Sequence, residues 1–238
     1  WALRDTPESM GLPPVEQWRG DLEGAVKSER SGAESARDIL FKHVLNNRQI
    51  WFLSLANFFV YLVRYGAMDW APTYLVEVKH SSVAVASAKT ALFELVGIAG
   101  TLFAGYLIDT RFRHRRHMVN VIYMLLLVFA VIALWKLPAG TPILDGVMLG
   151  VIGFLVYGPQ MLVGALAVDA GGKYAAATAS GFTGFWGYLG SIASGVGTGW
   201  IVDRYGWNGG FMFFVGAAIL GTLFFLATGP TAVGRVKR

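Results

Sequence analysis

The sequence predicts an all-α membrane protein whose six membrane-spanning helices form two triplets related by an internal repeat. The first observation is composition, because 55% of the 238 residues are hydrophobic and only 15% are charged, against about 25% charged residues in soluble domains. The second is a series of long uncharged runs, since about 20 apolar residues are needed to cross a bilayer. The third is a repeated segment in the second and fifth runs.

The hydrophobic runs divide the chain into three regions. Residues 1–45 are polar, with several prolines and scattered charges, which predicts a cytoplasmic interdomain linker with one amphipathic turn at about 33–44. A domain of six transmembrane helices is predicted over 46–230, and a cytoplasmic tail over 231–238. The expected spans are about 49–69, 83–108, 118–136, 146–168, 174–202 and 208–229.

Basic residues indicate how these spans are oriented. Lysines and arginines gather in the linker, in the tail and in "DTRFRHRRHM" after the second span, and they are few in the loops on the other side. Because cytoplasmic loops carry an excess of Lys and Arg, both ends of the segment are expected to be cytoplasmic. The net charge of +5 therefore reflects membrane orientation. The expected surroundings are a lipid bilayer, and no nucleic-acid partner is predicted.

The internal repeat predicts how the six spans are related. A shift of 94 residues places "LVGIAGTLFAGYLID" (95–109) over "LGSIASGVGTGWIVD" (189–203). This relates the second of three spans to the second of the next three. The sequence therefore predicts a 3+3 inverted repeat, an arrangement typical of one six-helix half of a secondary transporter.

Arg64 is the main candidate for a binding residue because it lies inside the first span. An arginine at the bilayer centre costs about 2.5–3.5 kcal/mol on insertion scales and usually faces the bundle interior or an aqueous cavity. Its planar guanidinium suits a phosphate or a carboxylate. The alternative is a purely structural arginine that pairs with Asp69. However, a separation of five residues places Asp69 about 140° around the helix axis from Arg64, so the two do not share a face. Tyr61 and Asn57 lie on the same stripe as Arg64.

Three further candidates follow from the second span and from the repeat. Glu94 lies within the second span and could be a counter-charge for Arg64, a proton acceptor or a helix-packing group. The 94-residue shift places Arg64 over a position next to Tyr157, and Glu94 over Tyr188. Because equivalent positions of an inverted repeat face one midplane cavity, these four residues are predicted to form one group. Lys89 is expected to extend to the membrane surface.

Other features suggest structural or gating roles. Pro159, after Gly158, predicts a bend in the fourth span. Asp109 and Arg113 follow the second span, where they could latch a closed state or could only fix orientation. The sequence has no cysteine, which excludes disulfides and thiolate metal sites. With no catalytic motif evident, neither an enzyme, a metal site nor a cofactor is predicted.

Several long stretches resemble the organophosphate:phosphate antiporter family of the major facilitator superfamily. The stretches that resemble it are "RDTPESMGLPPVE", "FVYLVRYGAMDWAPTYL", "EVKH", "GFLVYGPQML", "GFTGFWGYLG" and "GWNGGFM". They cover nearly the whole chain and are most similar to the C-terminal half of glycerol-3-phosphate transporters. The resemblance implies a major facilitator C-terminal six-helix bundle in the bacterial inner (plasma) membrane.

The resemblance also implies roles for the residues already singled out. Arg64 matches the phosphate-binding arginine of the C-terminal half, which in this family works with a second arginine on the first helix of the N-terminal half. Tyr61, Glu94, Tyr157 and Tyr188 match positions that line the pocket or its gating network. A complete member would exchange an organophosphate such as glycerol-3-phosphate for inorganic phosphate by alternating access. The expected partner is an N-terminal six-helix half, absent from this chain.

Two alternatives remain open from the sequence. One is an organophosphate sensor of the same fold that does not transport, and the other is a fragment that retains only a structural C-terminal domain. Two departures from glycerol-3-phosphate transporters bear on the substrate: "DAGGKYAAAT" between the fourth and fifth spans, and Gln160, which is more similar to hexose-phosphate transporters and their sensor relative.

Overall fold

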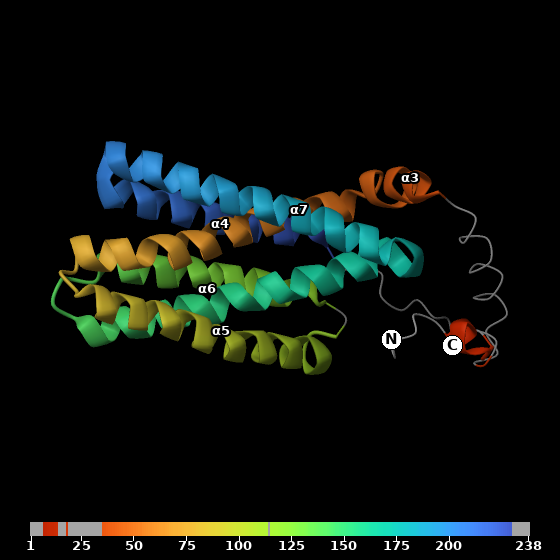
Figure 1. The fold of residues 1–238 in the computed structure, drawn as a ribbon, viewed down its shortest axis with the longest axis horizontal. Helices are drawn as coiled ribbons and strands as arrows, with labels where there is room; N and C mark the ends of the chain where they lie inside the picture. The colour runs from red at the N-terminus through yellow and green to blue at the C-terminus, as the bar shows by residue number, and fades with distance from the viewer. Residues whose placement is uncertain (1–6, 14–17, 19–34, 114, 230–238) are drawn as a thin grey trace.

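The computed structural model describes residues 7–13, 18, 35–113 and 115–229. Its long helices lie side by side in one elongated bundle (Figure 1). Most of the predicted linker and the whole predicted tail over 231–238 lie outside the described residues. The proposed boundaries of linker, domain and tail therefore stay predictions.

Four helical segments make up the bundle: α4 (Arg48–Glu77), α5 (Val83–Thr110), α6 (His117–Lys136) and α7 (Pro142–Thr228). The 87 residues of α7 would measure about 130 Å as one rod, at 1.5 Å per residue. Its backbone leaves helical geometry at Gly172 and Gly206. These breaks divide α7 into 142–171, 173–205 and 207–228, so the described chain holds the six predicted membrane-length helices.

The two breaks in α7 depend on glycine. Gly172 has φ 68° and ψ 179°, and Gly206 has φ 68° and ψ −175°. This region of backbone space is essentially open only to glycine, because a Cβ would clash with the neighbouring carbonyl. Each glycine thus lets the chain reverse between two long helices with almost no connecting loop.

The first span is longer than the sequence predicted. It was expected over about 49–69, whereas α4 continues to Glu77. Asp69 is exposed and does not end the helix, and the residues after it pack on the last helix. Tyr74, for example, contacts the rings of Trp207 and Phe211 at centroid distances of 5.2 and 4.9 Å. Tertiary packing therefore extends the helix past the charge.

Gly158 and Pro159 do not interrupt the fourth helix. The backbone stays helical through both residues, and the breaks lie elsewhere. Both residues are buried, and a Cβ on Gly158 would overlap the ring of Tyr123. Gly158 thus serves close packing between α7 and α6. The helix thus continues through Pro159, as membrane helices do when neighbouring groups compensate the lost hydrogen bond, and the predicted bend stays a prediction.

Helix packing follows the predicted repeat. The second helix of each triplet packs closely on the first helix of the other triplet. A Cβ on Gly153 of 142–171 would overlap the carbonyl oxygen of Phe93 on α5. Likewise, a Cβ on Gly190 of 173–205 would overlap the carbonyl oxygen of Phe58 on α4. Small residues allow such approaches between membrane helices. The two equivalent contacts bring the middles of four helices together.

Short helical elements precede the bundle. They are η1 (Pro7–Met10), α3 (Ala36–Ile39) and η2 (Leu40–Leu45). Val44, at the end of the predicted linker, is fully buried in a small cluster with Ile50 and three alanines of α7. The last residues before α4 are thus packed on the bundle, although the sequence predicted a boundary at 45.

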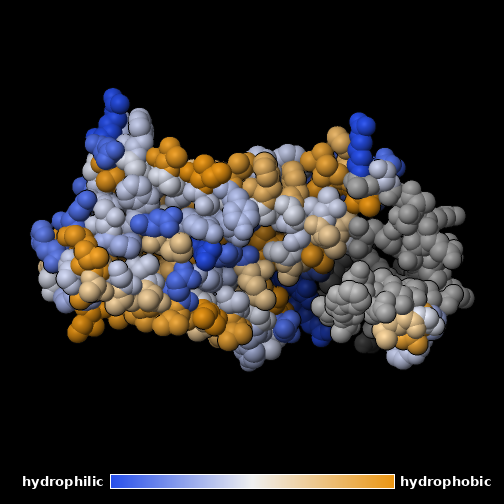
Figure 2. All heavy atoms as spheres, viewed as in Figure 1, coloured by the Kyte–Doolittle hydropathy of each residue, from blue (hydrophilic) through white to orange (hydrophobic). Residues whose placement is uncertain are grey.

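The surface of the bundle suits a bilayer. Figure 2 shows apolar residues along both long edges of the viewed face and hydrophilic residues along its middle and at one end. Many large apolar side chains are exposed. Five of them are 58–73% exposed: Leu95, Ile98, Leu102, Ile192 and Val196. A lipid or protein neighbour must cover such a surface, because water does not solvate it favourably.

Replacing Gly206 by alanine tests the break between the last two helices. The φ of 68° is strained for any residue with a Cβ, so Gly206→Ala is expected to lower stability by about 1–3 kcal/mol. The measurement is thermal unfolding of the purified protein in detergent. Gly216→Ala is the matched control, because Gly216 is helical and has no atom within 4 Å of an added Cβ. Equal unfolding temperatures in both variants would contradict the argument.

Candidate functional site

Arg64 lies near the middle of the membrane-spanning part of α4. It is 16 residues after Arg48 and 13 before Glu77, which places it about 20–24 Å from either end of the helix. Only 14% of its side chain is exposed. A cation in this position needs polar partners, because the surrounding apolar groups cannot replace its hydration shell.

Tyr157 and Glu94 are those partners. Arg64 Nη2 donates a hydrogen bond to the Tyr157 hydroxyl at 2.7 Å and lies 3.9 Å from Glu94 Oε1. The Tyr157 hydroxyl in turn donates to Glu94 Oε2. The tyrosine therefore lies between the two charges and is hydrogen-bonded to both. Three helices, α4, α5 and α7, each contribute one member of this group.

Aromatic rings form the rest of the surroundings of Arg64. Its guanidinium carbon lies 4.6 Å from the ring centroid of Tyr157 and 5.0 Å from that of Tyr65. Tyr65 contacts Tyr61, and Tyr61 contacts Tyr188, each with centroids 5.7 Å apart. Tyr188 is 61% exposed. The tyrosines thus form a row that leads from the buried cation to the open face of the bundle.

Glycine packing fixes Tyr157 in this group. A Cβ on Gly97 of α5 would lie 2.5 Å from the Tyr157 ring, so the ring rests directly against the α5 backbone. Gly97 is less than one turn past Glu94. The same helix surface therefore positions both the ring and the carboxylate that its hydroxyl contacts.

In the structure, four of the predicted binding residues lie in one group with Arg64: Tyr61, Glu94, Tyr157 and Tyr188. The side chain of Asn57 lies beside that of Tyr61, since both approach Gly187, and its binding role stays a prediction. Asn57 is buried and its amide donates to the Thr183 carbonyl at 2.9 Å, so it joins α4 to 173–205. Asp69 is exposed, and Arg64 pairs with Glu94 instead. The angular argument that separated Asp69 from Arg64 agrees with this geometry.

Two of the predicted gating residues, Asp109 and Arg113, lie at the end of α5 and just after it. Asp109 and Arg113 are both exposed, and their gating role stays a prediction. The ion pair found nearby joins Arg116 Nη1 to Asp169 Oδ2 at 2.9 Å, linking the start of α6 to α7. In the described part of the chain, no group of three His, Asp or Glu side chains could hold a metal ion.

Two more residues lie near the site: Tyr65, which the sequence analysis did not single out, and Gln160, which it considered only for substrate choice. Tyr65 follows Arg64 directly and lies four residues after Tyr61, a spacing that places two aromatic rings on one helix face. Gln160 has a buried side-chain oxygen without a hydrogen-bond partner in the described structure, and it interacts with Tyr61. Its spacing of three residues from Tyr157 on one helix could have indicated this.

The arrangement can hold an anion. A guanidinium has five N–H donors, and in the described structure Arg64 makes a hydrogen bond only to Tyr157, while its buried Nε has no partner. The remaining donors are matched in geometry to phosphate or carboxylate oxygens. Glu94 supplies the negative charge that balances Arg64 when no anion is bound.

These features define a multi-pass membrane protein with a charged, tyrosine-lined group at mid-membrane. A model of the Major Facilitator Superfamily matches residues 1–195, and the chain belongs to that superfamily. The predicted fold, an all-α major facilitator bundle, is thereby confirmed.

Within this superfamily, the chain is similar to several individual proteins. The chain is 44% identical over 230 residues to a glycerol-3-phosphate transporter of Bacillus subtilis, covering 96% of this chain and 52% of the relative. It is 40% identical over 236 residues to a probable hexose phosphate transport protein of Chlamydia pneumoniae, covering 95% and 52%. It is 37% identical over 227 residues to the membrane sensor protein UhpC of Escherichia coli, covering 95% and 52%.

The chain thus spans about half the length of the curated relatives it matches. Their names describe transporters and a sensor, which agrees with the prediction that the chain is not an enzyme.

Replacing Gly97 by alanine tests the packing that positions Tyr157. The added methyl group would overlap the tyrosine ring, and overpacking of this kind costs about 1–3 kcal/mol. Thermal unfolding in detergent is the measurement, with Gly105→Ala as control, because nothing lies within 4 Å of a Cβ on Gly105 of the same helix. If the two variants were equally stable, Tyr157 would not be held against α5 as described.

Proposed function

We propose that this chain is the C-terminal half of a secondary transporter that exchanges glycerol-3-phosphate or a related organophosphate for inorganic phosphate by alternating access. The observation that supports this most strongly is the mid-membrane guanidinium of Arg64, with free donors and a tyrosine-bound counter-charge. The named transport activities of the relatives support the substrate class.

The proposed site is half of a phosphate-binding site. Arg64 holds the phosphoryl group, while Tyr61, Tyr157 and Tyr188 contact the substrate or line its path. An N-terminal six-helix half contributes the opposing face and, by family resemblance, a second arginine. The Asn57 amide nitrogen is used in helix packing, while its side-chain oxygen is buried without a hydrogen-bond partner in the described structure.

Glu94 is the charge partner of Arg64 when the site is empty. Its carboxylate lies 3.9 Å from the guanidinium, and an incoming phosphate must weaken this attraction. Binding therefore releases Glu94 and Tyr157 from Arg64. Because α5 and α7 carry these two residues, substrate binding changes the contacts between three helices and lowers the barrier to alternating access.

The proposed location is the bacterial inner membrane, with both ends of this segment cytoplasmic. The excess of basic residues in "DTRFRHRRHM" and in the segment before α4 supports this orientation. In that orientation, the α4–α5 turn and the α6–α7 turn lie on the extracytoplasmic side.

A sensor without transport is the second candidate, and the similarity to the membrane sensor protein UhpC favours it. The two candidates share the phosphate site and differ in whether the site opens to both sides. Counterflow of labelled phosphate in vesicles carrying the full-length protein distinguishes them. A sensor would bind phosphate esters without counterflow.

Arg64→Lys tests the guanidinium. Lysine keeps the charge but has no planar fork, so phosphate counterflow by the full-length protein is expected to fall about tenfold or more, the value of one to two charged hydrogen bonds. Arg48→Lys makes the same change at the start of the same helix and is expected to have little effect. Unchanged counterflow in Arg64→Lys would contradict phosphate binding by the fork.

Glu94→Gln tests the counter-charge. Removing the carboxylate removes the negative charge that competes with phosphate for Arg64, so the phosphate concentration at half-maximal counterflow is expected to fall about three- to tenfold, a coupling of the usual size between two ligands. Glutamine retains an acceptor for the Tyr157 hydroxyl, so the packing is preserved. A rise in this concentration would show that Glu94 contributes to phosphate binding directly.

A further inference from the structure

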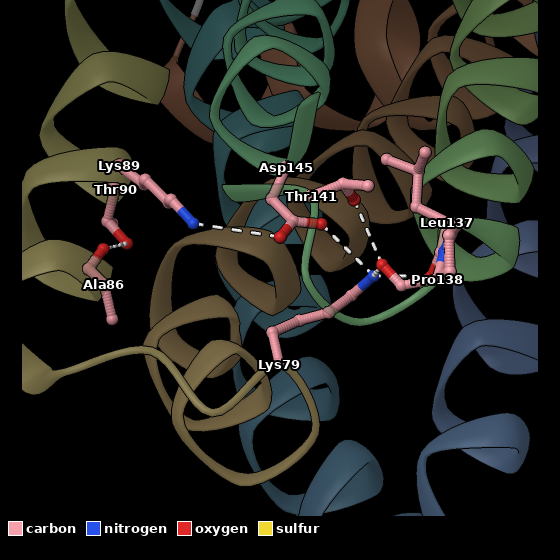
Figure 3. A network of polar contacts seen from close by, with 8 residues as sticks. All are labelled: Lys79, Ala86, Lys89, Thr90, Leu137, Pro138, Thr141 and Asp145. Atoms are coloured by element: carbon pink, nitrogen blue, oxygen red, sulfur yellow. Dashed lines mark hydrogen bonds and ion pairs between the residues drawn. The ribbon is translucent and has the colours of Figure 1, made fainter. Parts of the chain in front are cut away.

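A second polar group lies buried at one end of the same helices, where α4 ends and where α5 and α7 begin. Figure 3 shows the Asp145 carboxylate between the ammonium groups of Lys79 and Lys89. Asp145 Oδ1 lies 3.2 Å from Lys79 Nζ, and Asp145 Oδ2 lies 3.8 Å from Lys89 Nζ. The side chains are 1%, 9% and 2% exposed for Lys79, Lys89 and Asp145. The expectation that Lys89 reaches the membrane surface is therefore wrong.

Lys79 ties this group to the end of α6. Its ammonium donates to the carbonyl oxygens of Leu137 and Pro138 at 2.5 and 3.2 Å. The last carbonyls of a helix have no partners within the helix, and a lysine there satisfies them. Lys79 thus makes two hydrogen bonds to backbone carbonyls and an ion pair with Asp145.

Lys89 is the under-coordinated member. Its ammonium has no hydrogen-bond partner in the described structure, and its only charge partner there is the Asp145 oxygen at 3.8 Å. Two cations share one anion, so the group carries a buried excess positive charge. Lys89 is therefore held by an ion pair with Asp145 that lacks a hydrogen bond, and this attraction draws the start of α5 toward α7.

The buried group and the Arg64 site involve the same three helices. Lys79 lies two residues after the end of α4, which carries Arg64. Lys89 and Glu94 lie on α5, and Asp145 and Tyr157 lie on α7. Lys89 is five residues from Glu94, about 7.5 Å along the helix. A shift of α5 at Lys89 therefore moves Glu94 relative to Tyr157 and Arg64.

We propose that Lys89 is a positioning residue for the phosphate site, which acts through Glu94. Its attraction to Asp145 holds α5 so that the Glu94 carboxylate stays against Tyr157 and Arg64 when the site is empty. This inference rests on the proposed function, because the counter-charge matters only if Arg64 binds an anion. Lys79 and Asp145 form the fixed part of the group, since Lys79 is also bound to the end of α6.

Lys89→Met tests this in the full-length protein. Methionine keeps the length and apolar character of the side chain, and the remaining Lys79–Asp145 pair is electrically neutral. Glu94 is then less firmly held near Arg64, so the half-saturating phosphate concentration for counterflow is expected to fall about threefold or more. A merely destabilised protein would show less counterflow without tighter apparent binding.

A double-mutant cycle tests whether Lys89 affects phosphate binding through Glu94. In a Glu94→Gln background, Lys89→Met is expected to change the half-saturating concentration no further, because the group it positions is already neutral. Lys136→Met is the control: it removes an exposed lysine at the same end of the bundle, outside the buried group. It is expected to leave the half-saturating concentration unchanged in both backgrounds.

The outcomes separate the two proposals. If the unmodified protein shows phosphate counterflow but Lys89→Met behaves as Lys136→Met does, the positioning role is wrong and the transport function stands. Equal effects of Lys89→Met with and without Glu94→Gln would also overturn it, since Lys89 would then act independently of Glu94. If the unmodified protein shows no counterflow, both proposals fail.

Discussion

The structure depends on how one cation is accommodated in the middle of a membrane. Arg64 is largely buried in α4 and is balanced by Glu94, with Tyr157 hydrogen-bonded to both. Because desolvated charges are costly unless they are paired and hydrogen-bonded, these contacts require α4, α5 and α7 to meet at the same depth. The close helix packing, and the glycines that allow it, follow from this requirement.

That requirement also gives the site its capacity to change. A permanently satisfied arginine would only stabilise the bundle, but Arg64 keeps donors free and its counter-charge is on another helix. An anion that replaces Glu94 therefore changes a contact between helices as well as occupying a site. In the proposed mechanism, binding and helix movement are coupled through one carboxylate, which is the differential interaction that any ligand-driven transition needs.

Much of the fold and site could be predicted from the sequence, because membrane-length apolar runs and an intramembrane charge are strong signals. The repeat placed Tyr157 and Tyr188 near Arg64 before any contact was known. Tertiary packing explains the failures. Asp69 did not end α4. Lys89 was drawn inward by Asp145, a partner 56 residues away that helix periodicity cannot reveal.

The central claim is that Arg64 binds phosphate directly. Solid-state NMR of the full-length protein in lipid, with ¹⁵N-labelled arginine and inorganic phosphate, can detect ³¹P–¹⁵N dipolar coupling across a guanidinium–phosphate contact. If Arg64 binds phosphate, this coupling appears when phosphate is added and is weaker in Arg64→Lys, which lacks the guanidinium nitrogens of Arg64. Phosphate counterflow with a coupling that Arg64→Lys leaves unchanged would contradict the claim.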